Sequence, residues 1–236
     1  DYGADSSSVS SLLSSGVSVI YSTSNAFAAL KTDGSVVTWG HSNSGGDSSS
    51  VSSLLSSGVS VIYSTDSAFA ALKDDGSVIT WGSSSGGDSS TTYGGNLSSG
   101  VVAVYSNFRA FAALKTDGSV VTWGDSRNGG NSYVNDGSPN YNNITNVSSS
   151  LSSGVVAVFS SNYAFAALKN DGSVVSWGWG NFGGDLGKIY DRVDSQYVVV
   201  SDVSSDLTSG VSKIFSTDNA FAALKNDGSV VTWGYA

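Results

Sequence analysis

The sequence predicts an all-β fold, namely a five-bladed β-propeller whose blades are antiparallel sheets of three to four short strands and whose ring closes between the N- and C-termini. The first observation is a stretch, AFAALKTDGSVVTWG at 26–40, that returns nearly unchanged at 68–82, 110–124, 164–178 and 220–234. The second is that its strands are apolar on both faces. The third is that the two chain ends, placed together, reproduce the linker between internal copies.

One unit of the repeat reads as short strands separated by turns. Residues 7–16 (SSVSSLLSSG) predict an irregular outer segment or a short edge strand. KTDG at 31–34 predicts a hairpin turn, because Gly34 is free to take a positive φ, and 41–47 is a Gly-rich exit loop. The β-branched and aromatic segments predict strands at 17–21 (VSVIY), 26–30 (AFAAL) and 35–40 (SVVTWG).

These strands do not alternate between apolar and polar residues, as a sheet wet on one side would. In AFAAL, Phe27 and Ala29 point one way and Ala28 and Leu30 point the other, so both faces are apolar. Each sheet must therefore be covered on both sides, and the small alanines allow close stacking of sheet on sheet. Sheets stacked around an axis make a propeller, whereas the coils of the alternative, a β-solenoid, are usually shorter and lack this hairpin.

The chain ends indicate a whole number of units. Joined, they give the linker YADYGAD, which matches the internal linker HSNSGGD in length and in its Gly and Asp positions. Closure of the ring would also remove exposed sheet edges. We therefore expect one domain over 1–236, with repeats at approximately 6–47, 48–88, 89–131, 132–185 and 186–236 closed by 1–5.

Composition excludes several classes of function. The net charge of −9 argues against a nucleic-acid partner, and no basic stripe forms because five of the ten basic residues occupy one equivalent position of the repeat. The absence of cysteine excludes disulfides and thiolate chemistry. No apolar run is long enough for membrane insertion. Residue 1 is Asp and no cleavable leader opens the chain, so we expect a matured product or a piece of a longer protein.

The run AFAALKTDGSVVTWGHSNSGGD at 26–47, with VSSLLSSGVSVIYS upstream, resembles the RCC1-like repeat (regulator of chromosome condensation type). That repeat has an alanine–leucine strand, an Asp-Gly turn, a Val-x-x-Trp-Gly strand and a Gly-rich loop. The chain is also similar to the repeats of a propeller-type β-lactamase inhibitor protein and to Ser-rich short-repeat proteins of algal protists. The resemblance covers nearly the whole chain outside two insertions and implies a β-propeller.

Three departures from the family limit what the resemblance implies. Family members typically close with seven blades, whereas five units are present here. The family's Gly-x-x-His before the alanine strand is replaced in the segment 22–26, which reads STSNA. The loop signatures of the chromatin-bound nucleotide-exchange member are missing, so exchange activity does not carry over. Fold alone does not choose among propeller functions.

Three residue types recur once per unit, and each has two interpretations. The tryptophans suit either sugar stacking or packing between blades, and their identical strand-end position favours packing. The lysines and aspartates of the hairpins suit either a charged recognition ring or turn chemistry with weak exposed pairs, which we favour. They are Trp39, Trp81, Trp123, Trp177 and Trp233; Lys31, Lys73, Lys115, Lys169 and Lys225; and Asp33, Asp75, Asp117, Asp171 and Asp227.

Metal binding and catalysis have little support in the sequence. The Gly-rich loops carry Asp47, Asp88 and Asp185, but their spacing matches no calcium loop, so we expect no metal. His41 is the single histidine, and the abundant Ser and Asp residues around it do not define a triad. We therefore expect a protein that is not an enzyme and that needs no cofactor.

The insertions at 131–146 and 186–202 are the parts that the units do not share. Tyr and Arg are enriched where proteins bind each other, and QYVVVS at 196–201 predicts an added strand. The two insertions belong to successive junctions, so we expect them side by side on one rim. The candidate partner-binding residues are Tyr133, Asp136, Tyr141, Trp179, Phe182, Tyr190, Arg192 and Tyr197.

The function predicted is a non-catalytic protein-interaction or scaffold propeller that binds a protein partner through one face and the two insertions, as a subunit of a larger assembly. The alternatives are a multivalent carbohydrate-binding propeller lectin and an extracellular structural repeat protein. Glycosylation candidates in Asn-x-Ser/Thr sequons favour a secreted, lumenal or cell-surface protein, and they are Asn96, Asn143 and Asn146.

Overall fold

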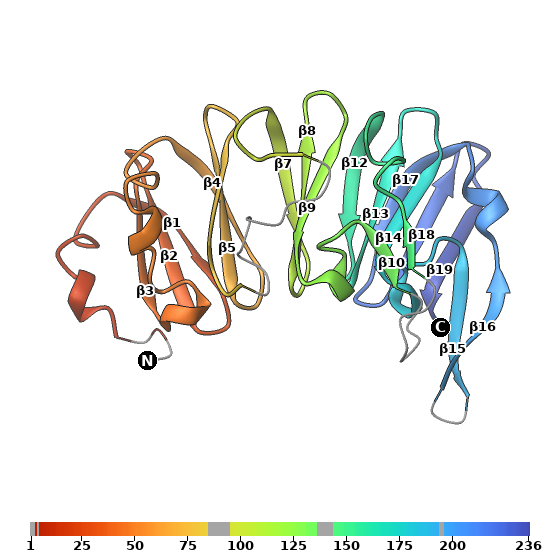
Figure 1. The fold of residues 1–236 in the computed structure, drawn as a ribbon, viewed down its shortest axis with the longest axis horizontal. Coiled ribbons are helices and arrows are strands. Elements are labelled where there is room, and N and C mark those ends of the chain that lie inside the picture. The colour runs from red at the N-terminus through yellow and green to blue at the C-terminus, as the bar shows by residue number, and fades with distance from the viewer. Residues whose placement is uncertain (1–2, 4, 85–94, 136–143, 194–195) are drawn as a thin grey trace.

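The computed structural model describes residues 3, 5–84, 95–135, 144–193 and 196–236, and it contains five β-sheets of mainly antiparallel strands that follow one another along the molecule (Figure 1). We number them sheets 1 to 5 in chain order. Sheet 1 contains β1 (Val17–Ser22), β2 (Ala26–Lys31) and β3 (Val36–Gly40). Sheet 2 contains β4 (Val59–Ser64), β5 (Ala68–Lys73) and β6 (Val78–Gly82). Sheet 3 contains β7 (Val101–Ser106), β8 (Ala110–Lys115) and β9 (Val120–Gly124).

Sheets 4 and 5 repeat this meander and add a hairpin to its outer edge. Their repeated strands are β12 (Val155–Ser160), β13 (Ala164–Lys169) and β14 (Val174–Trp179), then β17 (Val211–Ser216), β18 (Ala220–Lys225) and β19 (Val230–Tyr235). The added strands are β10 (Tyr133–Asn135) and β11 (Ile144–Asn146) in sheet 4, and β15 (Lys188–Val193) and β16 (Gln196–Asp202) in sheet 5.

Each added hairpin joins its sheet through a parallel pairing. β10 pairs with β14 in the register Val134 to Gly178, and β15 pairs with β19 in the register Ile189 to Gly234. The strand expected at 196–201 is therefore confirmed as β16. These two sheets have five strands, so the expected three to four is wrong for them.

The Ser-rich segments between sheets are irregular, as one of the two interpretations of 7–16 proposed. They contain the 3-10 helices η1 (Ser7–Val9), η3 (Ser49–Val51) and η6 (Ser204–Leu207). Further 3-10 helices lie in the Gly-rich loops: η2 (Ser42–Ser44), η4 (Ser126–Asn128) and η5 (Gly180–Phe182). In the part of the chain that the structure describes, no helix is long and apolar enough to cross a membrane.

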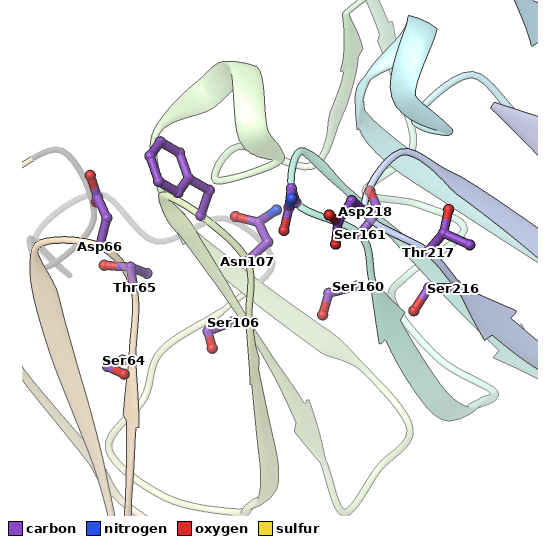
Figure 2. A pocket seen from close by; sticks show the side chains of 12 residues that line it. Ser64, Thr65, Asp66, Ser106, Asn107, Ser160, Ser161, Ser216, Thr217 and Asp218 are labelled. Atoms are coloured by element: carbon purple, nitrogen blue, oxygen red, sulfur yellow. The ribbon is translucent and has the colours of Figure 1, made fainter. Parts of the chain in front are cut away.

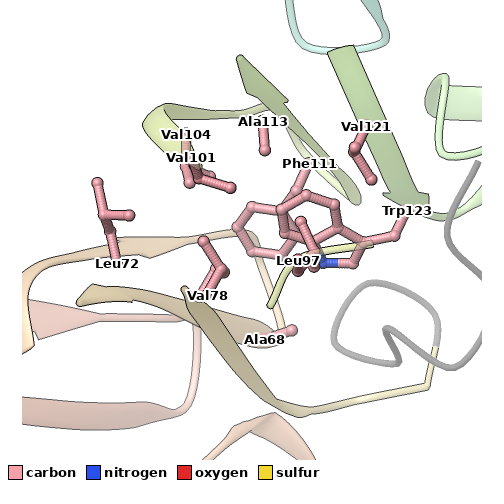
Figure 3. Packing of buried hydrophobic residues seen from close by; sticks show 11 residues of the cluster. Ala68, Leu72, Val78, Leu97, Val101, Val104, Phe111, Ala113, Val121 and Trp123 are labelled. Carbon is pink, nitrogen blue, oxygen red and sulfur yellow. The ribbon is translucent and has the colours of Figure 1, made fainter. Parts of the chain in front are cut away.

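The core consists of apolar layers between consecutive sheets. At the junction of sheets 2 and 3, Ala68, Leu72 and Val78 of sheet 2 face Phe111 and Trp123 of sheet 3 (Figure 3). Phe69, which follows Ala68 in β5, packs instead against sheet 1. The prediction that alternate residues of AFAAL bury opposite faces is confirmed, and β5, β8 and β13 are buried over their first five residues.

The recurring tryptophans pack between the sheets. Each stacks on the phenylalanine opposite it in its own sheet, with ring centroids 5.2–5.3 Å apart. The indole N–H of Trp81 also reaches the preceding unit, where it donates to the carbonyl of Gly45 at 3.0 Å. Trp177 donates to Gly129 at 3.0 Å and Trp233 donates to Gly183 at 3.1 Å. The packing interpretation is therefore confirmed.

A backbone ladder also connects the sheets through the turns that follow their first strands. The N–H of Ser24 donates to the carbonyl of Asp66 at 2.9 Å, and the N–H of Asp66 donates to that of Phe108 at 3.0 Å. The N–H of Phe108 donates to the carbonyl of Asn162 at 3.1 Å, and the N–H of Asn162 donates to that of Asp218 at 2.9 Å. One turn from every sheet is thus linked in sequence order.

The expected closure of the ring between the termini is wrong, because sheets 1 and 5 lie at opposite ends of an open array (Figure 1). Ile20 of β1 is 56% exposed, whereas its equivalent in sheet 2, Ile62, is 2% exposed. Val230 of β19 is 62% exposed, and its equivalent Val120 is 1% exposed. The matching linkers show only that the chain holds a whole number of repeats. The side chains packed between sheets set the angle from one sheet to the next, and linker length carries no information about it.

Candidate functional site

The recurring lysines hold the outer segment of their own unit. Lys31 Nζ donates to the carbonyl of Leu12 at 3.0 Å, and Lys73 repeats the bond to Leu54 at 2.9 Å. The other three lysines bond the equivalent carbonyls of Asn96, Ser150 and Asp206. Each of the five ammonium groups therefore has a structural acceptor in the outer segment of its own unit, so these contacts favour a structural role over a recognition ring.

The recurring aspartates fix the hairpin turns. Asp33 Oδ1 accepts the hydroxyl of Ser35 at 2.6 Å and its N–H at 3.0 Å, and the other four units repeat this pair of bonds. The Ser35 hydroxyl, followed by the Ser35 N–H, lowers the pKa of Asp33 below its ordinary value. These carboxylates are exposed and each is bonded within its own turn, so the turn interpretation of the charged ring is the one that the contacts favour.

The second insertion forms a hairpin that a buried tyrosine anchors. Tyr190 of β15 is 4% exposed, and its hydroxyl donates to Asp185 Oδ2 at 2.8 Å. The same carboxylate oxygen lies 3.1 Å from Lys188 Nζ. Tyr190 therefore has a structural position inside the sheet, and among the candidate residues it is not a surface contact.

β16 is the outer edge of sheet 5, and all seven of its residues are exposed. Its apolar residues run consecutively, from Tyr197 through Val198 and Val199 to Val200, and Val200 is 55% exposed. Such a strand offers main-chain hydrogen-bonding groups along its free edge together with apolar side chains. Soluble proteins usually blunt such edges with charge or proline.

An aromatic cluster lies beside this hairpin, at the Tyr197 end of β16, and brings together three of the predicted residues. Phe182 has ring centroids 5.3 Å from Trp179, 5.7 Å from Tyr197 and 5.9 Å from Tyr235. Tyr163 extends the cluster, 4.9 Å from Phe182. Tyr163 and Tyr235 were not predicted. The available signal was that each occupies a repeat position where the other units carry different residues.

The remaining predicted residues are dispersed. Tyr133 is half-buried in β10, and Arg192 is exposed near the tip of the β15–β16 hairpin, where its N–H donates to Asp191. Asp136, Tyr141 and the sequon residue Asn143 lie outside the described residues. Asn96 and Asn146 are exposed, and each side-chain oxygen accepts the N–H of the sequon serine, Ser98 or Ser148.

A pocket that the sequence did not predict opens among the ladder turns, with a volume of about 440 Å³ (Figure 2). Four successive sheets each supply three consecutive residues to its lining. They are Ser64, Thr65 and Asp66; Ser106, Asn107 and Phe108; Ser160, Ser161 and Asn162; and Ser216, Thr217 and Asp218.

The three positions of each turn have different tasks. The middle residue caps the next strand: Asn107 Oδ1 accepts the N–H of Ala110 at 2.8 Å, and its amide nitrogen donates to Asn128 at 2.7 Å. Ser161 repeats this arrangement with Ala164 and Phe182. The middle residues are therefore structural, which leaves the first-position serines and the varied third-position residues to determine the chemistry of the pocket.

Two third-position residues are carboxylates. Asp66 accepts the hydroxyl of Ser67 at 2.8 Å and lies 3.6 Å from Arg109, whose guanidinium also sits 5.2 Å from the ring centroid of Phe108. Asp218, in the last sheet, is exposed. The lining is thus rich in hydroxyl groups and acidic, with a single large apolar side chain in Phe108.

No protein-family model and no curated protein matches the chain. Solved structures do match. Human WBSCR16 is 21% identical with a TM-score of 0.51, covering 92% of this chain and 61% of that one. Kap60 bound to yeast RCC1 (Prp20) matches at 19% identity and a TM-score of 0.50, covering 88% of this chain and 53% of that one.

The CRINKLY WD40 ectodomain of the Arabidopsis thaliana receptor kinase ACR4 matches at 12% identity with a TM-score of 0.46, over 92% of this chain and 63% of that one. The chain thus spans between about half and two thirds of the length of these structures. At these identities the likeness concerns the fold alone, and it identifies an all-β, propeller-type array of antiparallel sheets.

Proposed function

We propose that the chain is an RCC1-like repeat protein that acts as a non-catalytic interaction module and binds a protein partner along β16 and the aromatic cluster beside its Tyr197 end. The observation that carries this proposal is the exposed edge strand β16, in which Tyr197 and three consecutive valines face solvent. Apolar surface on a free strand edge is typical of sites that bind other chains.

Strand addition is the binding mode that this edge favours. A partner segment in extended conformation would pair with the free main-chain groups of β16, and its alternate side chains would meet the valines on either face. The neighbouring rings of Phe182 and Tyr197, 5.7 Å apart, offer an aromatic anchor beside the strand. The pairing of β15 with β19 fixes the hairpin to the sheet, so the edge is formed before a partner arrives.

The similarity to the yeast RCC1 (Prp20) structure is consistent with this role. The similar yeast RCC1 (Prp20) structure has Kap60 bound, so a chain of this fold does engage another protein. The proposal assigns no cofactor or catalytic residue. The single histidine, His41, lies directly before η2 in a Gly-rich loop, away from β16 in sequence and in a different sheet unit.

The test is selection of extended peptides from a display library on the immobilised protein, followed by fluorescence-anisotropy titration. The variant V198K/V200K places two charges on the edge, and we expect at least tenfold weaker binding of the selected peptides. V156K is the matched control, because Val156 is 53% exposed on β12 in sheet 4. The proposal fails if no peptide is selected, or if selected peptides bind V198K/V200K as tightly as the unmodified chain.

The pocket of the ladder turns favours a second candidate function, binding of a polyhydroxylated ligand such as a glycan. Its first-position serines Ser64, Ser106, Ser160 and Ser216 offer hydroxyl groups that both donate and accept. Phe108 adds one apolar surface for a sugar face. This arrangement supports one axial site and differs from the several equivalent sites expected of a multivalent lectin.

Calorimetry with glycans selected from an array tests this second function. The expected stoichiometry is one ligand per chain, and S106Y, which fills the pocket, should abolish the heat of binding. S60Y is the control, since Ser60 lies earlier in an equivalent first strand and outside the pocket lining. Several equivalent sites, or binding that S106Y leaves intact, would contradict it.

A further inference from the structure

We propose that the two ends of the sheet array bind each other in different copies of the chain, so that the protein associates head to tail. The N-face is the side of sheet 1 turned away from sheet 2, with Leu13, Val17 and Ile20. The C-face is the side of sheet 5 turned away from sheet 4, with Phe215, Ala222 and Val230. The second copy is the occupant because the four internal junctions show what covers each of these faces.

Every internal junction buries the same pair of faces. At the first, Leu55, Val59 and Ile62 of the second unit pack against Ala26, Ala28 and Leu30 of the first. The equivalents of Ile62 in sheets 3, 4 and 5 are each 3% exposed, whereas Ile20 on the N-face is 56% exposed. Leu13 is half-buried, although its equivalents Leu55 and Leu151 are each 1% exposed.

The C-face lacks the matching cover. Tyr21, Tyr63, Tyr105 and Phe159 each pack against the apolar cluster formed with the following sheet. Their equivalent in sheet 5, Phe215, is 57% exposed. Val230 is 62% exposed, and its equivalents Val78, Val120 and Val174 are 6%, 1% and 4% exposed. Apolar side chains that pack within the internal junctions are therefore more exposed at both ends of the array.

The backbone groups at the two ends are complementary as well. Within the array, the first strand of each sheet donates to the hairpin glycine of the preceding sheet, as Val59 does to Gly34 at 3.0 Å. The outer strand donates to the following unit, as Val36 does to Leu55 at 3.0 Å. By the same pattern, the backbone N–H of Val17 in one copy would donate to the carbonyl of Gly228 in another. The N–H groups of Val230 and Asp218 in that other copy would donate to the carbonyls of Leu13 and Ser24.

The hairpin glycines give an independent steric observation. A Cβ added to Gly34, Gly118 or Gly172 would lie 2.7–2.9 Å from the backbone nitrogen of a glycine in the next unit. A Cβ added to Gly228 meets nothing within 4 Å. The last hairpin thus carries the glycine that close approach of a further unit requires, and the end of the array leaves that space open.

Because the two faces differ, their contact is heterologous: it forms a closed ring if the rotation between copies closes, and a filament if it does not. The test is sedimentation velocity of the unmodified chain from low to high micromolar concentration, and we expect species larger than a monomer as concentration rises. I20D blocks the N-face and V230D blocks the C-face. Both positions are exposed, so both variants should fold, with circular dichroism as the check.

Each variant alone should need at least tenfold higher concentration to associate, so it should stay monomeric at concentrations where the unmodified chain assembles. An equal mixture should form a 1:1 heterodimer, because I20D keeps an intact C-face and V230D keeps an intact N-face. V156D, at an exposed valine of sheet 4, should assemble as the unmodified chain does. A chain that stays monomeric at every concentration, single variants that still assemble, or a mixture that fails to dimerise would each overturn the proposal.

Discussion

The indole N–H of Trp177 donates to the carbonyl of Gly129 at 3.0 Å, across the junction between sheets 3 and 4. This single bond ties the end of one unit's outer strand to the Gly-rich loop of the unit before it. Trp177 is fully buried, and its ring stacks on Phe165 with centroids 5.3 Å apart. The residue therefore contributes a hydrogen bond, an aromatic contact and core volume at one place.

Replacing this tryptophan with phenylalanine should destabilise the protein. W177F loses the bond to Gly129 and leaves a cavity, so we expect about 2–4 kcal/mol lower free energy of unfolding in a urea titration. W39F is the control, because Trp39 is only half-buried at the end of the array, and a smaller loss is expected there. Equal losses for the two variants would mean that the junction does not determine the effect.

Two hairpin glycines offer a matched comparison of junction packing. Gly118 and Gly228 both have positive φ, 77° and 86°, so alanine strains both backbones alike. In G118A the new Cβ also meets Gly154 N at 2.9 Å, whereas in G228A it meets nothing within 4 Å. We expect G118A to lose about 1–2 kcal/mol more stability than G228A, measured by chemical denaturation at a protein concentration where the chain is monomeric.

The anchor of the β15–β16 hairpin should control its local stability. Y190A removes a buried ring and the bond to Asp185, so we expect about 3 kcal/mol of destabilisation and faster amide hydrogen exchange over 188–202. Y197A changes an exposed ring, and it should leave exchange over 188–193 within twofold of the unmodified chain. Unchanged exchange in Y190A would show that the hairpin is held elsewhere.

The hairpin aspartates should titrate at unusually low pH. The hydroxyl of Ser119 is the main cause that lowers the pKa of Asp117, and the Ser119 N–H comes second. Because the folded-state pKa lies below the unfolded one, this group contributes stability that is present above the unfolded pKa and is lost as pH falls through the folded pKa. In S119A the pKa of Asp117 should rise towards its ordinary value.

Carboxyl carbon NMR shifts recorded from neutral to acid pH measure this pKa directly. Asp171 in the same sample is the internal control, since its partner Ser173 is unchanged in S119A. An Asp117 titration that S119A leaves in place would show that the serine hydroxyl is not the cause.

The sequence predicted the layers well because packing periodicity is local. Phe27 and Ala28 point to opposite faces in any strand, so two apolar faces and a stacked array followed from five letters. Closure did not follow, because the exposure of Ile20 and Val230 depends on an angle that accumulates over five sheets. The matching linker at the chain ends shows that the number of repeats is whole, but it contains no information about that angle.

The candidate site was predicted only in part, for a similar reason. The β-branched and aromatic residues of QYVVVS predicted β16, but the anchoring of Tyr190 depends on its contact with Asp185 in the loop before β15. The pocket was missed because its lining is spread over four units as three-residue turns. The one signal available was the capping residue in each turn, Thr65, Asn107, Ser161 or Thr217, which is always able to accept a backbone N–H.

The same turns both line the pocket and carry the backbone ladder from Ser24 to Asp218. The width of the pocket therefore changes together with the curvature of the whole array. Straightening the array would pull Asp66, Phe108 and Asn162 apart, and any molecule wedged among them would set how sharply the chain curves.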